Sequence, residues 1–190
     1  MRRQLPTAIA VFVAFSVLAG LVYPLVVTGI SQVAFGPKAD GSLLVRAGAV
    51  VGSSLIGQPF EGPQYFHPRP SAAGDGYDAM ASAPSNLGPS NPVLLDAVAE
   101  RRAQYRRTNS LGADEQVPVE AITGSASGLD PHISPADARL QARRVAAARG
   151  VPLDRVLRLV DEATEGRSLG FLGDPGVNVL ELNLALDERL

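Results

Sequence analysis

The sequence contains no cysteine and only one lysine, Lys38, among its 190 residues. Without cysteine the chain can form neither disulfides nor thiolate metal sites, so we expect any folded domain to be stabilised by packing alone. The scarcity of lysine excludes P-loop nucleotide binding and Schiff-base chemistry, unless Lys38 itself is used. These absences narrow the chemistry that is open to the chain.

The chain has no excess of positive charge, and histidine is scarce. The formal net charge is −2, whereas proteins that bind nucleic acid carry a concentrated positive surface, so we expect no nucleic-acid partner. The only histidines, His67 and His132, lie far apart and form no ligand pair at helical spacing, which argues against a metal site. No Walker loop is present, and no glycine-rich stretch lies between a clear strand and helix, so no nucleotide-binding motif is recognised.

The sequence does contain a long uncharged run, residues 5–35. Within it, residues 8–27 form an apolar stretch that as a helix reaches roughly 30 Å, the thickness of a hydrocarbon core. Because a lone segment satisfies its backbone in lipid only as a helix, we predict one membrane-spanning helix. Pro24 marks either a kink or the exit from lipid. The less favoured alternative is a cleaved secretory signal with Arg2 and Arg3 as its basic start, since signal cores run only about 7–15 apolar residues.

The charges that flank this run predict its direction. The two N-terminal arginines lie close to one end, whereas Lys38 and Arg46 lie farther from the other. Since positive residues favour the cytoplasm, we expect a cytoplasmic N-terminus. Residues 1–36 are then the tail and anchor, and residues 37–190 form one extracytoplasmic domain with its own hydrophobic core.

Small residues recur at four-residue spacing within the predicted anchor: Ala10 with Ala14, and Ser16 with Gly20. Such spacing allows another membrane helix to approach closely. Chance in an alanine-rich helix explains the pattern equally well. The four residues are therefore candidate contacts with a partner helix.

Local patterns in the rest of the chain predict both strands and helices, and so an α+β domain. Two β-rich runs in residues 41–58 predict a hairpin, and β-branched residues predict a strand at residues 119–123. Cap signals predict three helices. They begin at Pro92 after Asn91, at Pro135 after Ser134, and at Pro152, and the last two end at Gly150 and Gly166. The tail from Val177 alternates as a strand does, with a helix from Leu180 as a close alternative.

Residues 124–135 gather Ser125, Ser127, Asp130 and His132, which invites a serine hydrolase interpretation. Neither serine has the flanking glycines of a nucleophile elbow, and catalytic triads are assembled from separate parts of a fold. Asp130 and His132 are more simply turn residues that precede a helix. We predict no catalytic site, and a membrane-anchored extracytoplasmic hydrolase using Ser127, Asp130 and His132 is the alternative function.

Six blocks of the sequence closely resemble the C subunit of the Kdp potassium-transporting ATPase, the KdpC family. They are GSSLIGQPF (52–60), YFHPRPSA (65–72), SNLGPSNP (85–92), SASGLDPHISP (125–135), RVAAARG (144–150) and LGFLGDPGVNVLELNLALD (169–187). Together with the anchor they cover nearly the whole chain in the family's order. One block is weak evidence, whereas six in register are highly specific.

The resemblance implies a non-catalytic subunit of a bacterial inner-membrane pump that hydrolyses ATP to take up potassium. The implied partners are a channel-like potassium-binding subunit, a P-type ATPase subunit and a very small single-helix subunit. In that family the C subunit is needed for assembly and acts as a catalytic chaperone that raises the ATPase subunit's affinity for ATP. The complex, rather than this chain, is expected to handle ATP and potassium. The residues agree, because the DKTG phosphorylation motif of P-type ATPases is absent.

Residues 59–92 are rich in proline and glycine yet contain aromatic residues, which argues for an ordered, functional loop. A domain outside the membrane cannot touch a nucleotide bound inside, so any effect on ATP affinity must travel through helix packing or a conformational equilibrium. We expect the domain to cap the channel-like subunit near its ion entrance. Candidate subunit contacts are Tyr65, Phe66 and Arg69 in the loop, for which local packing is the alternative, together with Ser127 and Asp130.

Overall fold

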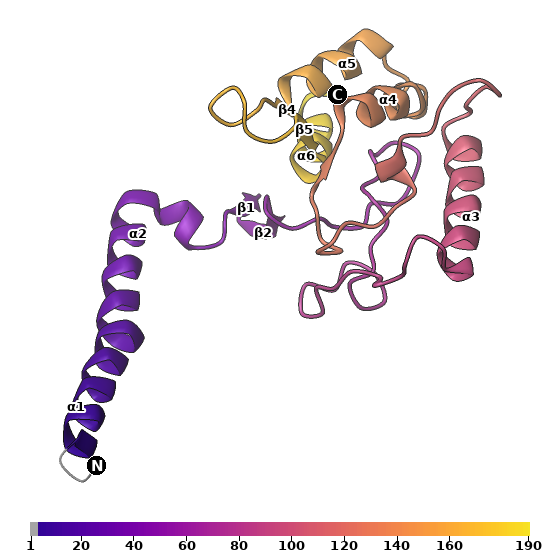
Figure 1. Ribbon diagram of the computed structural model, residues 1–190. Helices are drawn as coiled ribbons and strands as arrows, with labels where there is room; N and C mark the ends of the chain where they lie inside the picture. The colour runs from indigo at the N-terminus through magenta and orange to yellow at the C-terminus, as the bar shows by residue number, and fades with distance from the viewer. Residues whose placement is uncertain (1–3) are drawn as a thin grey trace. The chain divides into compact units, whose positions relative to one another are not determined.

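The computed structural model describes residues 4–190. The chain divides into two compact units, Met1–Val51 and Gly52–Leu190. The first contains the apolar helix, and the second contains most of the helices and a small sheet (Figure 1). The α+β class predicted from the sequence is confirmed.

The first unit is dominated by one long helical segment, Gln4–Ala39, which is long and apolar enough to cross a membrane. It consists of α1 (Gln4–Val17), a π-helical turn (Leu18–Val22) and α2 (Tyr23–Ala39). None of the described residues in these elements is buried. An apolar helix with no buried side chain has its whole surface available to lipid or to other helices.

The π-helical turn lies immediately before Pro24. A proline has no N–H to donate and its ring crowds the carbonyl four residues back, so an α-helix adjusts at that point. Here the Tyr23 N–H bonds to the Leu18 carbonyl, five residues back, which widens the turn. The helix continues beyond Pro24, and the backbone leaves helical dihedral angles at Phe35, where φ is −140°.

The predicted hairpin near residue 48 is confirmed. Strands β1 (Leu43–Arg46) and β2 (Ala49–Ser53) form a two-stranded sheet. Ala47 and Gly48 between them have φ values of 48° and 80°. Two consecutive residues with positive φ match the twist of paired strands and close a tight hairpin.

The core of the second unit is built by three helices and a three-stranded antiparallel sheet in the order β3-β5-β4. The elements are β3 (His132–Ile133), α4 (Pro135–Arg149), α5 (Leu153–Glu162), β4 (Thr164–Glu165), β5 (Gly176–Asn178) and α6 (Val179–Arg189). His132 pairs with Asn178, and Glu165 pairs with Gly176. The helices gather around the strands in Figure 1, and apolar residues from α4, α5, α6, β3 and β5 form one buried cluster together with Phe66.

Helix α4 begins and ends where its cap signals predict. The Ser134 hydroxyl accepts a hydrogen bond of 3.1 Å from the Asp137 N–H, and Gly150 adopts a left-handed conformation with φ of 65°. Such caps satisfy backbone groups that a helix end leaves unpaired. Helix α5 also forms but ends at Glu162, earlier than the predicted Gly166, because the chain turns there into β4.

Two sequence-based expectations differ from the structure. Residues 119–123 form no strand; Val119–Ala121 is a single 3-10 turn, in which the Thr123 hydroxyl donates to the Val119 carbonyl at 2.8 Å. The tail follows the helical alternative, since α6 begins at Val179 after the Asn178 side chain accepts from the Glu181 N–H at 3.2 Å. In both places a local side-chain bond stabilises helical backbone over an extended strand.

Helix α3 (Pro92–Thr108) begins after Asn91, whose side chain accepts from the Val93 N–H at 2.9 Å, as predicted. It lies at the edge of this unit in Figure 1 and is joined to α4 by the Tyr105 hydroxyl, which donates to Asp137, and none of its residues is buried. Residues 59–91, which precede it, contain no helix or strand. This loop and α3 enclose the site described next.

Candidate functional site

Two side-chain amides hold the middle of the long loop. Asn183 of α6 accepts from the Phe66 N–H at 2.8 Å and donates to the Phe66 carbonyl at 3.0 Å. Gln141 of α4 makes the same pair of bonds with His67, at 2.8 and 3.0 Å. Each amide thus satisfies both backbone groups of one residue, as a neighbouring strand does. The loop is fixed without forming regular structure.

Arg144 of α4 fixes the part of the loop that comes just before. Its guanidinium donates to the carbonyls of Pro63 and Tyr65, each at 2.8 Å, and its Nε donates to Asn109 Oδ1 at 3.0 Å. Burial lowers the pKa of Arg144. A planar group with five donors suits this arrangement of separate acceptors.

The loop residues proposed as subunit contacts differ in exposure. Phe66 is 0% exposed and belongs to the core cluster. Its side chain therefore packs within the domain, which is the alternative to a subunit contact. Tyr65 is half-buried: its hydroxyl donates to Asp187 at 3.3 Å, and the Arg149 guanidinium lies 5.2 Å from its ring centre. Of these two, only Tyr65 retains surface that a partner can reach.

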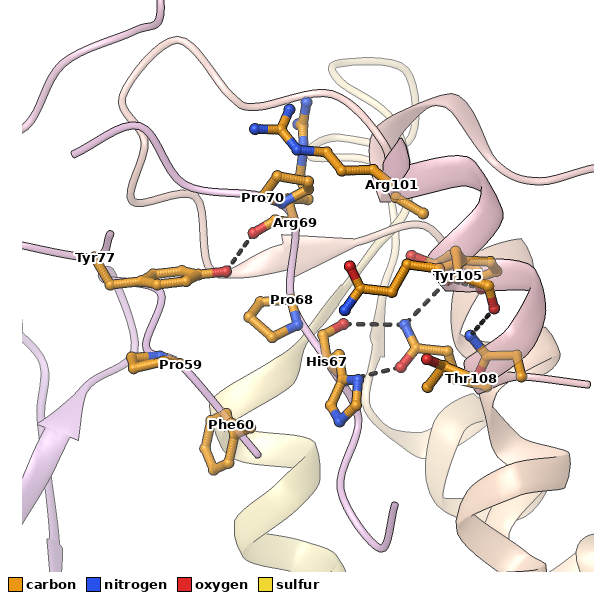
Figure 2. Close-up of a pocket in the computed structure, with 15 residues that line it drawn as sticks. Pro59, Phe60, His67, Pro68, Arg69, Pro70, Tyr77, Arg101, Tyr105 and Thr108 are labelled. Atoms are coloured by element: carbon orange, nitrogen blue, oxygen red, sulfur yellow. Dashed lines mark hydrogen bonds between the residues drawn. The ribbon is translucent and has the colours of Figure 1, made fainter. Parts of the chain in front are cut away.

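A cleft of about 320 Å³ lies between the loop, α3 and α4. Figure 2 shows Tyr77 and Tyr105 on opposite sides of it, with His67 and Pro68 between them. The Tyr77 hydroxyl donates to the Arg69 carbonyl, which ties two parts of the loop together. The wall of the cleft is therefore held by this bond within the loop and by the bonds between Gln141 and His67, which are 74 positions apart.

Asp137 is the buried acid of this cleft. Its Oδ1 accepts from the Tyr105 hydroxyl of α3 and from Gln141 Nε2, the latter at 3.0 Å. Burial raises the pKa of Asp137 to about 6. Burial and the neighbouring Asp137 carboxylate also raise the pKa of Tyr105. The pKa of His67 is lowered by burial and by the Arg144 charge. The cleft therefore favours neutral forms of its titratable groups.

Arg69 belongs to a second polar cluster. Its NH1 donates to Asp130 Oδ2 at 2.9 Å. On the other side of the carboxylate, His132 Nδ1 lies 3.6 Å from Asp130 Oδ1, and His132 Nε2 lies 3.9 Å from Glu165 Oε2. Interaction with His132 lowers the pKa of Asp130, and interaction with Asp130 raises the pKa of His132. The structure thus joins two predicted site residues, Arg69 and Asp130.

The geometry does not assemble a hydrolase triad. Ser127 Oγ accepts from the Leu129 N–H at 3.1 Å and lies 3.4 Å from Ser125 Oγ. Among the contacts of residues 4–190, none joins Ser127 to His132, which a nucleophile and its base require. Within the same residues, no group of three acidic or histidine side chains could hold a metal ion.

No sequence motif assigns a role to Gln141, Arg144 or Asn183. A signal was present: Asp137, Gln141 and Arg144 recur at helical spacing within an alanine-rich helix, as residues on one face do. Polar residues in such positions must find partners, because burying them unpaired is costly. The loop partners of Gln141 and Arg144 lie 74 to 82 residues away, and that of Asn183 lies 117 residues away, so the sequence alone does not name them.

The candidate contact residues of the anchor are exposed on its surface. Ala10, Ala14 and Ser16 of α1 and Gly20 of the π-helical turn are all exposed. A Cβ added at Gly20 would meet no atom within 4 Å. The helix is thus free to pack against another helix at these positions.

The apolar helix and the α+β domain define a class: a protein with one N-terminal segment consistent with a membrane anchor and a small folded domain after it. Comparison with known proteins gives the family. The model of the K+-transporting ATPase c chain, KdpC, matches residues 5–188, so the chain belongs to the KdpC family. Membership implies partnership with the other subunits of the Kdp ATPase.

Relatives match along their full length. The potassium-transporting ATPase KdpC subunit of Mycobacterium bovis (strain BCG / Pasteur 1173P2) is 59% identical over 187 residues, which cover 98% of this chain and 99% of the relative. The KdpC subunit of Rhodospirillum rubrum is 54% identical over 189 residues, covering 100% and 97%. That of Koribacter versatilis is 50% identical over 187 residues, covering 98% and 95%. The resemblance carried by the six sequence blocks is confirmed.

Proposed function

We propose that this chain is a non-catalytic accessory subunit of a high-affinity, ATP-driven potassium uptake pump. It is needed for assembly, and it raises the affinity of the P-type ATPase subunit for ATP. Its partners are that subunit, a channel-like potassium-binding subunit and a small single-helix subunit. The observation that carries the proposal is the full-length match to KdpC subunits, which includes both the apolar helix and the folded domain.

The chain lies in the bacterial inner membrane with its N-terminus in the cytoplasm and residues 37–190 outside. Support comes from the flanking charges, because the two N-terminal arginines lie closer to the apolar run than Lys38 and Arg46 do. Protease added to intact spheroplasts is then expected to digest the domain and to spare the N-terminus. Digestion of the domain only in inside-out vesicles would reverse the orientation.

The effect on ATP affinity is indirect. A domain on the outer side cannot reach a cytoplasmic nucleotide, so it acts by biasing the pump between conformations that bind ATP differently. The anchor, through Ala10, Ala14, Ser16 and Gly20, packs against a partner helix. The domain caps the channel-like subunit near its ion entrance. Support comes from the exposure of those four residues and from the stiff loop that carries Tyr65 and Arg69.

Ser127 and Asp130 are also contact candidates. Ser127 is exposed, and Asp130 is half-buried beside Arg69. These residues and Leu55 border one shallow surface depression. A partner that covers this depression meets Ser127 and the rim of the Arg69–Asp130 pair together.

The ATP dependence of potassium-stimulated ATPase activity tests the proposal. Membranes that contain the complete complex are compared with membranes in which this chain is cut back to its first 51 residues. Truncation is expected to raise KM for ATP. A photoreactive ATP analogue is expected to label the ATPase subunit only. An unchanged KM in an assembled complex, or labelling of this chain, would contradict the proposed role.

A further inference from the structure

The connection between β4 and β5 presents three large apolar side chains to solvent at its tip. Leu169 is 83% exposed, Phe171 is 69% exposed and Leu172 is 50% exposed. They stand within four consecutive residues and outside the core cluster of the domain. Scattered exposed apolar residues are ordinary, but a contiguous group on a folded domain marks an interaction site. We define Ser168–Leu172 as the knob.

The knob has a fixed backbone. Ser168 and Leu172 exchange two hydrogen bonds, each of 2.9 Å, between their backbone N–H and carbonyl groups. Leu169 and Gly170 between them have φ values of 54° and 83°, which form a tight hairpin turn. A leucine at positive φ is unfavourable, and backbone strain of this kind is concentrated at functional sites. A fixed tip loses little conformational entropy when it is bound.

A polar cavity of about 460 Å³ lies at the base of the knob, lined in part by Ser168 and Leu172. Two further lining residues, Arg69 and Glu120, each bury a polar atom without a partner among the described residues: the Nε donor and the Oε1 acceptor. Buried polar groups are normally paired, so each unpaired one needs an explanation. The unpaired donor and the unpaired acceptor thus belong to two residues that line the same cavity.

The charges around the knob select the kind of partner. The cavity is lined by four carboxylates and one arginine. The carboxylates are Glu120, Asp130, Glu165 and Asp174, and the arginine is Arg69. Arg69 pairs with Asp130, and the nearby Arg167 pairs with Asp174 at 3.2 Å. Within residues 4–190 this leaves Glu120 and Glu165 as the lining carboxylates without an arginine partner, with His132 Nε2 3.9 Å from Glu165 Oε2. Insertion into an anionic bilayer surface relies on lysine and arginine beside the apolar residues. The acidic surroundings instead suit a protein surface with basic groups.

We propose that the knob is the docking element of the domain and inserts into an apolar socket with a basic rim on another subunit of the ATPase. Phe171 and Leu169 fill the socket, and a polar group of its rim enters the cavity beside Arg69 and Glu120. Rigid aromatic anchors surrounded by polar contacts are the usual centre of such interfaces. The inference rests on the proposed function, because it requires that the chain assembles with other subunits.

Photo-crosslinking in the intact complex identifies the occupant. A photoreactive phenylalanine analogue is placed at Phe171, and the control is the same analogue at Met80, which is 95% exposed and belongs to the long loop. We expect a crosslink from position 171 to one other subunit and none from position 80. Four results would contradict the docking role proposed for the knob: a crosslink to lipid, a crosslink to a second copy of this chain, equal crosslinking from both positions, or no crosslink.

Co-purification separates the knob from the proposed function. Phe171→Asp is expected to reduce recovery of the other subunits at least tenfold, while Phe171→Leu and Met80→Asp leave recovery unchanged. Because Phe171 is exposed, the melting temperature of the domain should be the same in all three variants. If the wild-type chain recovers its partners and Phe171→Asp recovers them equally, only the docking role of the knob is contradicted, and the proposed function stands. If wild-type chain recovers no partner, both proposals are wrong.

Discussion

Asn183 and Phe66, 117 positions apart in sequence, are joined by two hydrogen bonds between one side-chain amide and both backbone groups of the phenylalanine. The Phe66 side chain fills the core while its backbone is held by α6. Gln141 repeats the arrangement on the next residue, His67. The long loop therefore belongs to the folded core at this point, although it contains neither helix nor strand.

Replacing Asn183 with leucine is expected to destabilise the domain. The change leaves the buried N–H and carbonyl of Phe66 unpaired, and each unpaired group costs about 1–3 kcal/mol. We expect the free energy of unfolding to fall by about 2–5 kcal/mol, measured by urea denaturation of the full chain in detergent. The matched control is Gln116→Leu at an exposed position, with an effect within about 0.5 kcal/mol. Equal effects of both changes would contradict the role of Asn183.

Asp137 gives the stability of the domain a pH dependence. Its pKa in the fold is about 6, above the ordinary value of 3.8, so between these values the folded state binds more protons than the unfolded state. Stability should therefore rise as pH falls from about 6 to about 4, by up to about 3 kcal/mol. The measurement is the free energy of unfolding across this range.

Asp137→Asn is the matched variant for that measurement. Both hydrogen bonds to the side chain use Oδ1, so an asparagine oxygen can accept them in the same way. The variant should lose the part of the pH dependence that Asp137 supplies, and it should be the more stable protein above pH 6. The account of Asp137 fails if wild type and variant show parallel curves.

The two histidines are expected to have pKa values on opposite sides of 6.5, the ordinary value for histidine. Burial and the Arg144 charge lower the pKa of His67, whereas interaction with Asp130 raises the pKa of His132. Nuclear magnetic resonance of the ring protons resolves both titrations, because the chain has only these histidines. Asp130→Asn should lower the pKa of His132 and leave that of His67 unchanged. A shift of both, or of neither, would show that the Asp130–His132 contact is absent in solution.

The sequence predicted those elements whose signals are local. Ser134 and Gly150 mark the ends of α4 because a cap bonds to its own helix, within a few residues. The strand predicted at residues 119–123 was wrong. β-branched residues form a strand only when a partner strand is available, and here a local hydrogen bond closes a turn. The residues from Val177 onward fit the period of a strand and also that of an α-helix, since Leu182 and Leu186 lie on one face of either element.

The polar contacts of the site depend on distant parts of the chain and were not predicted. Arg69 and Asp130 were both selected from the sequence, but their ion pair across 61 positions was not. The bonds from Arg144 to the loop span about 80 positions. Local patterns carry no information about which acceptor a buried arginine meets. The recurrence of polar residues on one apolar face of α4 predicts only that partners exist.

The anchor predicts an assembly defect. Replacing Ala14 and Gly20 with leucine adds bulk to positions that are exposed on the helix and small enough for close approach. We expect recovery of the other subunits to fall several-fold in mild detergent. Val13→Leu, at another exposed position of α1, is the control and should have no effect. Normal assembly of the Ala14/Gly20 variant would show that these residues do not form the helix contact.

Purification of the native complex from membranes of potassium-starved cells tests the central claim most directly. A tag on this chain should recover a subunit that becomes phosphorylated by ATP, together with the channel-like and single-helix subunits, in fixed proportions and with potassium-stimulated ATPase activity. A chain that is recovered alone, and that carries a hydrolytic activity of its own, would contradict the account.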